Sequence, residues 1–481
     1  MTIAIVGSGF AGLGMAIALL RAGRQDFVVL EKATDVGGTW RDNTYPGVAC
    51  DVASNLYSFS FAPNPGWSRS FSPGPEIQRY LQDCATTFGV LPHIRFGFAV
   101  CEARWQQDQQ HWRLVAASGE VVLAKYLVAG MGGLHRPLLP QIAGLGDFAG
   151  QAFHSAQWRH DIDLRGKRVA VIGTGASAIQ FVPEVAKVAA EVVLFQRTPP
   201  WILAKDDVPI APWKQALFRR LPVLQLLKRA LIYAYMELRV PGFTRLPGAL
   251  RLAQVLALGH LKRQVADPAL RRKLTPDYVM GCKRILLSNN YYPALCQPHV
   301  QVHTTGIDRV VADGVVLTDG SHQPADVLIY GTGFAATDPL PAGMLFGQDG
   351  LDITDAWQNG PEAYLGTAVH GFPNLFLLVG PNTGLGHSSM VYMIESQIAY
   401  VLGALQAVER RQARQLVVRR EVQDRYNVRL QQRLLNTVWH RGGCRSWYLH
   451  ASGKNVTLWP GFTWQFRRAT ARFVPADYEW Q

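Results

Sequence analysis

Short apolar runs followed by glycine-rich turns mark the first part of the chain. Residues 2–6 read Thr-Ile-Ala-Ile-Val, a turn occupies 7–12, and the mainly apolar stretch 12–20 follows. After Gly23 comes a second apolar run, 27–30. A continuous apolar run is typical of a buried strand, and glycine favours the end of a helix. The pattern predicts a strand, a helix over 12–20 that Gly23 ends, and a second strand.

The same pattern recurs in the middle of the chain. Residues 168–172 read Arg-Val-Ala-Val-Ile, a glycine turn occupies 173–178, and 192–195 is the next apolar run. A strand, a glycine turn, a helix and another strand are typical of a parallel sheet with covering helices. The predicted fold class is therefore α/β, with two Rossmann-like dinucleotide-binding domains.

The stretch 205–274 has a different pattern, with long runs rich in Leu, Ala and Arg such as 224–240. We expect a helical insertion in the second domain, broken by the prolines at positions 222, 241 and 247. A further long helix is expected over 391–409.

Both glycine turns suit the pyrophosphate of a dinucleotide. Their glycines let the backbone approach the phosphates, and the helix that follows offers partial positive charge. Glu31 stands 24 residues after Gly7, and Arg197 stands 24 residues after Gly173. An acid at this position accepts hydrogen bonds from a ribose 2′-hydroxyl, whereas an arginine binds a 2′-phosphate. The first unit is thus predicted to hold FAD or NAD, and the second NADP.

Two dinucleotide sites in one chain indicate a two-dinucleotide flavoprotein. One class of these reduces disulfides and needs a redox cysteine pair near the first unit, but Cys50 has no partner nearby in sequence. The reduced flavin is therefore expected to meet another acceptor, with dioxygen as the leading candidate.

The segment between the two units reads F-A-G-Q-A-F-H-S-A-Q-W over 148–158. It resembles the F-x-G-x-x-x-H-x-x-x-W fingerprint of the Baeyer–Villiger monooxygenases, which are class B flavin-dependent monooxygenases. Arg159 departs from the family, which commonly has Pro or Asp after the Trp. The resemblance implies that His154 organises the hinge between two cofactor domains and performs no chemistry.

Further motifs in the same order extend the resemblance over nearly the whole chain. Together with the turns, they imply that FAD contacts Gly7, Gly9, Phe10, Gly12, Glu31, Lys32, Gly38, Thr39, Trp40, Asp51, Val52, Tyr57, Val100 and Met390. They imply that NADPH contacts Gly173, Thr174, Gly175, Ala176, Ser177, Gln180, Arg197, Thr198, Lys283 and Trp447. Trp447 would belong to a mobile segment that closes over the nicotinamide.

The resemblance also identifies Arg284 as the catalytic arginine and Asp51 as its active-site partner. It implies that reduced FAD and dioxygen form a C4a-peroxyflavin, which attacks a ketone to give an ester or lactone. An arginine stabilises the anionic form of the peroxyflavin and the alkoxide that forms when it attacks the ketone. An aspartate holds the arginine guanidinium in place. If the stretch is extended, Lys283 faces the opposite side and joins Arg197 and Thr198 at the 2′-phosphate.

The implied domains are interleaved. The FAD domain comprises 1–147 and 334–481, and the NADP domain comprises 148–204 and 275–333, interrupted by the helical insertion. No metal site is predicted, because no two of the six cysteines have C-x-x-C spacing.

Two other functions stay open at this point. A class B enzyme that acts on sulfur or nitrogen, by sulfoxidation or N-hydroxylation, would depend less on Arg284. A non-catalytic basic module would bind nucleic acid or membrane and would hold no flavin.

The net charge of +13 is concentrated in the insertion, where 214–273 holds thirteen basic and two acidic residues. The basic residues form either a solvated face or a surface that touches anionic lipid weakly. No recognition motif accompanies the charge, so nucleic acid is not expected as a partner.

The wide cysteine spacing favours a reducing compartment with buried thiols. The first 20 residues lack the basic region of a signal peptide, and prolines and glycines interrupt the uncharged stretch 363–394. We therefore expect a cytoplasmic protein. The sequence indicates no oligomeric state.

Overall fold

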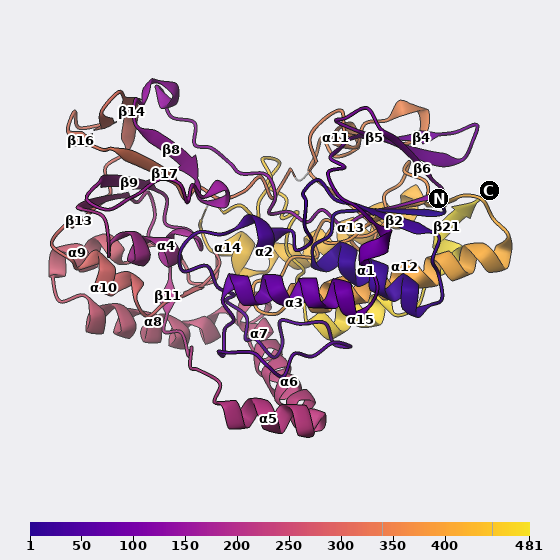
Figure 1. Ribbon diagram of the computed structural model, residues 1–481, viewed down its shortest axis with the longest axis horizontal. Coiled ribbons are helices and arrows are strands. Elements are labelled where there is room, and N and C mark those ends of the chain that lie inside the picture. Colours follow the sequence, from indigo (N-terminus) through magenta and orange to yellow (C-terminus); the bar gives the residue numbers. More distant parts are fainter. Residues whose placement is uncertain (339, 445) are drawn as a thin grey trace.

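The first strand–turn–helix unit adopts the predicted structure in the computed structural model, which describes residues 1–338, 340–444 and 446–481 (Figure 1). Strand β1 (Ile3–Val6) leads into helix α1 (Phe10–Arg21), and strand β2 (Phe27–Leu30) follows. Gly23, at φ +75°, donates its N–H to the Leu20 carbonyl at 2.9 Å and ends the helix as expected. The helix is longer than predicted at both ends.

The first sheet is parallel and draws on distant parts of the chain. Its order is β19-β7-β1-β2-β3, with β3 (Ile94–Arg95), β7 (Tyr126–Ala129) and β19 (Leu375–Leu377). Helices α1, α3 (Gly74–Thr87) and α12 (Met390–Arg411) share one hydrophobic core with this sheet. The carboxy-terminal part of the chain thus completes a sheet that the amino-terminal part begins.

The second sheet is parallel too and lies at the opposite end of the molecule (Figure 1). Its order is β13-β10-β9-β17-β8, with β8 (Gln151–His154), β9 (Arg168–Ile172), β10 (Glu191–Phe195), β13 (Val300–His303) and β17 (Val327–Tyr330). Helices α4 (Ala178–Val185) and α10 (Tyr291–Leu295) cover one face. The predicted α/β class with two Rossmann-like sheets is confirmed.

Smaller sheets flank the two large ones. Strands β4 (Val100–Gln106), β5 (His111–Ala116), β6 (Val121–Ala124) and β18 (Leu345–Phe346) form one, and β14 (Ile307–Val311), β15 (Gly314–Leu317) and β16 (His322–Pro324) form another. The remaining pairs are β11 (Ile202–Leu203) with β12 (Leu286–Leu287), and β20 (Leu416–Val418) with β21 (Tyr478–Trp480).

The insertion is helical, as predicted. Its helices are α5 (Pro212–Arg220), α6 (Pro222–Glu237), α7 (Val240–Thr244), α8 (Leu250–Gln264) and α9 (Pro268–Leu274). Pro222 starts α6, where a missing N–H costs nothing. Helices α5 and α6 extend below the two large sheets in Figure 1.

The remaining helices are short or carboxy-terminal: α2 (Thr39–Asp42), α11 (Ile353–Ala356), α13 (Arg420–Leu435), α14 (Val438–Arg441) and α15 (Thr463–Thr470). Helix α12 is long and apolar enough to cross a membrane by length and composition. It packs against α1 and α15 with most of its surface buried, as a core helix does.

His154 lies where the chain crosses between the two sheets. It ends β8, and its buried ring packs edge-on against Phe334, with the ring centroids 5.7 Å apart. Phe334 in turn pairs with Pro137 on the other crossing segment. The ring Nδ1 accepts a hydrogen bond from the Ala156 N–H at 3.1 Å. The position suits the structural role implied for this histidine.

The expectation of buried thiols is correct for only two of the six cysteines. Cys282 and Cys444 form a disulfide, with their Cα atoms 6.2 Å apart and 162 residues between them in sequence. Cys50 and Cys84 are free and buried, whereas Cys101 and Cys296 are exposed. A search for closely spaced cysteines misses such a bond, because the fold alone brings the two segments together.

Candidate functional site

The first glycine turn requires glycine at two of its positions. Gly7 has φ +94°, and a Cβ on Gly12 would lie 1.8 Å from the Gly7 carbonyl oxygen. A Cβ on Gly38 would lie 3.1 Å from the Cα of Gly9, so the start of α2 packs closely on the turn. Glycine at these positions lets the backbone segments pack closely at the amino end of α1, the end of a helix that favours an anion.

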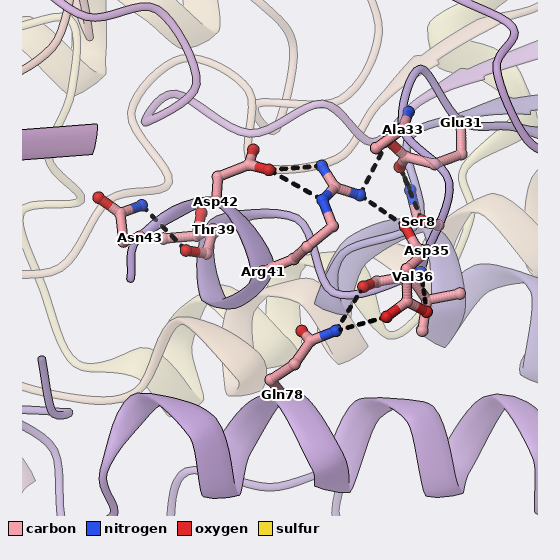
Figure 2. Close-up of polar contacts among 10 residues, drawn as sticks. All are labelled: Ser8, Glu31, Ala33, Asp35, Val36, Thr39, Arg41, Asp42, Asn43 and Gln78. Carbon is pink, nitrogen blue, oxygen red and sulfur yellow. Dashed lines mark hydrogen bonds and ion pairs between the residues drawn. The ribbon is translucent and has the colours of Figure 1, made fainter. Parts of the chain in front are cut away.

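Glu31 organises the polar contacts beside this turn (Figure 2). Its buried carboxylate accepts hydrogen bonds from the Ser8 N–H at 2.9 Å, the Ser8 hydroxyl at 2.7 Å and the Ala33 N–H at 3.0 Å. Arg41 lies 3.0 Å away as its ion-pair partner. Burial raises the pKa of Glu31, but the hydrogen bonds and Arg41 outweigh burial and lower it. The end of β2 thus carries an ionised acceptor, with Lys32 exposed beside it.

Aromatic residues from three predicted segments meet next to the turn. The Trp40 indole N–H donates to the Tyr57 hydroxyl at 3.2 Å, and the Phe10 ring packs edge-on against Tyr57 with centroids 5.2 Å apart. Val52 is buried in the same hydrophobic core. Thr39 opens α2 and is exposed.

The second glycine turn repeats the geometry of the first. Gly173 has φ +109°, and a Cβ there would lie 2.4 Å from the Gly331 carbonyl oxygen. The Thr174 hydroxyl donates to the Thr198 carbonyl at 3.1 Å, so the turn is tied to the segment after β10. Gly175 and Ala176 are exposed, and Ser177 is half-buried.

Two cations gather beside this second turn. Burial and the nearby charge of Arg197 lower the pKa of Lys283. The Lys283 ammonium lies 4.8 Å from the centre of the Tyr278 ring, and Arg197 is exposed. Two like charges repel each other, and an anion bound between them would compensate both. The pair formed by Lys283 and Arg197 is therefore suited to a phosphate.

Arg284 and Asp51 form an ion pair from distant parts of the chain. The Arg284 Nε donates to the Asp51 Oδ2 at 2.7 Å, and Nη2 lies 2.6 Å from the same oxygen. Nη1 donates to the Leu385 carbonyl at 3.2 Å. Burial raises the pKa of Asp51, but the Arg284 charge and hydrogen bond lower it overall. The attraction of Asp51 raises the pKa of Arg284, so both groups stay charged.

Gln180 joins helix α4 to the segment around Tyr45 and Ala49. Its amide nitrogen donates to the Ala49 carbonyl at 2.9 Å, and its amide oxygen accepts from the Tyr45 hydroxyl at 2.9 Å. Helix α4 is thereby fastened to the segment that leads to Asp51. The amide predicted to contact a nucleotide thus also ties the second dinucleotide turn to the ion pair.

Sequence reasoning missed two groups near the ion pair. Tyr448 is buried, its hydroxyl lacks a hydrogen-bond partner among the described residues, and burial raises its pKa to about 12 while the nearby Arg284 opposes the shift. Burial lowers the pKa of Lys205, with the charges of Asp207 and, to a smaller extent, Asp51 opposing that shift. Tyr448 adjoins the predicted Trp447, whose half-exposed ring lies 4.5 Å from it, but no motif points to Lys205.

Val100 and Met390 are the remaining predicted residues. Val100 opens β4, and Met390 is the first residue of α12; both are half-buried. Met390 packs against the cluster that includes Leu385 and Tyr448.

Comparison with known proteins places this geometry in a family. A family model described as flavin-binding monooxygenase-like matches residues 1–242. A Baeyer–Villiger monooxygenase of Pseudomonas aeruginosa is 54% identical over 99% of this chain and 90% of its own length. One from Streptomyces coelicolor is 48% identical over 99% of this chain and 92% of its own.

Solved structures of monooxygenases have the same fold as this chain. The closed crystal structure of a cyclohexanone monooxygenase matches with a TM-score of 0.90 and 28% identity, covering 100% of this chain and 99% of that one. A steroid monooxygenase bound to NADP matches with a TM-score of 0.86 and 29% identity, covering 98% and 96%. On fold, site geometry and sequence together, this chain belongs to the flavin-binding monooxygenases and, among them, to the Baeyer–Villiger monooxygenases.

Proposed function

We propose that this protein uses FAD and NADPH to insert one oxygen atom of dioxygen next to a ketone carbonyl, giving an ester or lactone. The observation that carries the proposal is the Arg284–Asp51 ion pair, with its 2.6 Å contact, in a chain that also holds two dinucleotide turns. The relatives named above support it, and one solved neighbour is a cyclohexanone monooxygenase with ε-caprolactone bound.

The residues of the first turn fit FAD. The glycine cradle would receive the pyrophosphate, and the ionised Glu31 would accept hydrogen bonds from the ribose. Trp40 and Tyr57 would border the flavin ring. A solved neighbour, OTEMO, is a complex with FAD and NADP at a TM-score of 0.88.

The residues of the second turn fit NADPH. Arg197 and Lys283 would hold the 2′-phosphate, because a guanidinium and an ammonium both pair with phosphate oxygens. Trp447 would contact the nicotinamide end. The choice of NADPH over NADH would then depend on these two side chains, of which Arg197 lowers the pKa of Lys283.

Bound FAD, once reduced by NADPH, would supply the activation of dioxygen. Arg284 stays protonated and would stabilise negative charge on the oxygen being transferred and on the carbonyl oxygen of the ketone adduct. Asp51 and the Leu385 carbonyl hold the guanidinium in one orientation. The Tyr448 hydroxyl, which lacks a partner among the described residues, is a candidate hydrogen-bond donor to the same oxygens.

We propose the domain division 1–147 with 334–481 for FAD, 148–204 with 275–333 for NADPH, and 205–274 for the insertion. The two large sheets support it, since one takes strands only from the first pair of ranges and the other only from the second.

The test is a product assay with the purified holoenzyme, NADPH and air, using cyclic ketones and thioethers followed by gas chromatography. Lactones or esters are expected from the ketones. Sulfoxides without any ester would identify a heteroatom oxygenase instead. A protein that purifies without flavin absorption and consumes no NADPH would contradict both.

A further inference from the structure

Helix α6 exposes apolar side chains to solvent and directs several polar side chains toward the protein. Gln225, Arg229 and Glu237 point inward, whereas the face turned to solvent is mostly apolar, with Lys228 as an exposed charged residue. Val223, Leu227, Leu231 and Leu238 follow one another at helical spacing and are between 57% and 77% exposed. Ala230 and Ala234 are exposed on the same side. The inner face also packs Ile232, Tyr233 and Met236 against the core, so the unusual feature is the apolar outer face, which is polar in an ordinary surface helix.

The inward polar contacts fix this orientation. Gln225 is buried and donates to the Asn64 carbonyl at 2.7 Å, and Arg229 donates to the Ser58 hydroxyl at 2.9 Å. At the end of the helix, the buried Glu237 accepts hydrogen bonds from the Thr463 N–H and hydroxyl. Rotating α6 to bury its leucines would leave these polar groups without partners, which is costly. The apolar face therefore stays outside.

Neighbouring helices carry the same kind of surface. Leu252, Val255 and Leu256 form a second exposed apolar stripe on α8, and Trp213 on α5 is 64% exposed. Several large apolar side chains exposed on neighbouring helices are typical of an interaction site on a protein surface. Cations lie over the exposed aromatic rings, with Lys214 over Trp213 and Arg239 over Tyr235.

The charge of this region identifies the partner. The segment 214–273 has thirteen basic and two acidic residues, and none of the basic ones forms an ion pair in the part of the chain that the structure describes. A second copy of the same surface would bring like charges together. An anionic bilayer complements both properties, because its acyl chains accept the leucines and its headgroups the cations.

We propose that α6, with α5 and α8, is a docking surface for anionic phospholipid membranes. The leucine stripe on α6 enters the headgroup boundary, and Trp213 and Tyr235 lie at the interface. The lipid phosphates are met by the exposed basic side chains of α5 and α6, which are Lys214, Arg219, Arg220, Lys228 and Arg239. The enzyme would then sit beside the phase in which apolar molecules dissolve. This surface does not depend on the proposed reaction.

Vesicle co-sedimentation of the purified holoenzyme tests the proposal. The test compares vesicles of phosphatidylcholine with phosphatidylglycerol and vesicles of phosphatidylcholine alone, each at low and at moderate salt. The wild-type protein should pellet with the anionic vesicles and release at higher salt. The variant Leu227→Glu/Leu231→Glu should lose binding by about tenfold or more, since it places two charges on the inserted face.

The matched control is Val428→Glu/Leu435→Glu on α13, whose two side chains are 58% and 48% exposed. It adds the same two negative charges away from the insertion and should bind nearly as the wild type does. Analytical ultracentrifugation without lipid follows all three proteins. The proposal is overturned if the wild type stays in solution with every vesicle, or if both variants lose binding equally. It is also overturned if the wild type is a dimer that the α6 variant dissociates, since a second copy would then cover the face.

Discussion

The Arg284 guanidinium lies 2.6 Å from the Asp51 carboxylate, although 233 positions separate the two residues in sequence. Asp51 follows the first dinucleotide unit, and Arg284 follows the insertion. Their contact spans the two proposed cofactor domains, so it exists only when both are correctly docked. Chemistry that needs this guanidinium is thereby coupled to the packing of one domain on the other.

Replacing Arg284 should leave the reduction of FAD by NADPH intact while it impairs the oxygenation of the ketone. In Arg284→Met, ester or lactone formation should fall by about 10²-fold or more, because the charge that stabilises the transferred oxygen is gone. NADPH oxidation should continue, with hydrogen peroxide as its product. Parallel measurements of NADPH, peroxide and ester check this. Arg309→Met, on strand β14 of the three-stranded sheet, is the control. An Arg284 variant with an unchanged ester yield per NADPH would contradict the role proposed for Arg284.

Arg197 should determine the choice of nicotinamide cofactor. In Arg197→Ala, the KM for NADPH should rise by about 10- to 100-fold, since one charged contact to the 2′-phosphate is lost. The KM for NADH should hardly change, because NADH lacks that phosphate. Steady-state kinetics with both cofactors provide the test. An equal rise in both KM values would indicate a structural role for Arg197 instead.

Lys283 should make NADPH binding sensitive to pH. Burial and Arg197 lower its pKa, so the free enzyme loses this proton at a lower pH than a free lysine, whose pKa is about 10.4. Only the protonated form attracts phosphate. Therefore kcat/KM for NADPH should fall as pH rises through the lowered pKa, while kcat/KM for NADH should not show this fall.

The variant Lys283→Arg offers a matched comparison, because arginine keeps its charge throughout this pH range. Its kcat/KM for NADPH should stay level where that of the wild type falls. Identical pH profiles for the two proteins would assign the fall to another group.

Glu31 should govern FAD retention. In Glu31→Ala, the Ser8 and Ala33 donors and the Arg41 charge lose their shared acceptor, at a cost of about 3 kcal/mol. The purified variant should contain less flavin, seen as a lower ratio of flavin to protein absorbance. Glu120→Ala, exposed on the surface, is the control. Full flavin occupancy in Glu31→Ala after dialysis would contradict the assignment.

The Cys282–Cys444 disulfide should stabilise the region around the ion pair. Cys282 directly precedes Lys283 and Arg284 in sequence, and Cys444 lies shortly before Trp447 and Tyr448. Reduction should lower stability by roughly 2–4 kcal/mol and the melting temperature by a few degrees. Thermal unfolding with and without dithiothreitol measures this, with Cys282→Ser as the permanently reduced form and Cys101→Ser as control. Two freely alkylated thiols in the native protein would show that the bond is absent.

Local patterns predicted the sheets and turns because their causes are local. Apolar runs form β1, β2, β9 and β10 wherever they can be buried, and the glycines at 7 and 173 are needed by their own backbone angles. The ion pair came from family resemblance alone. Tyr448, Lys205 and the disulfide were missed because they depend on segments that meet only in the folded chain.

Strand β19 closes the outer edge of the first sheet against β7, and it comes from the carboxy-terminal part of the chain. The second sheet takes all of its strands from one continuous run, 151–330. During synthesis the second sheet can therefore assemble first. Until β19 is made, the edge of β7 that pairs with it keeps unpaired backbone N–H and C=O groups. A nascent chain stalled before residue 375 should expose that edge to chaperones, and the glycine turn that emerged first should be the last to gain its complete sheet.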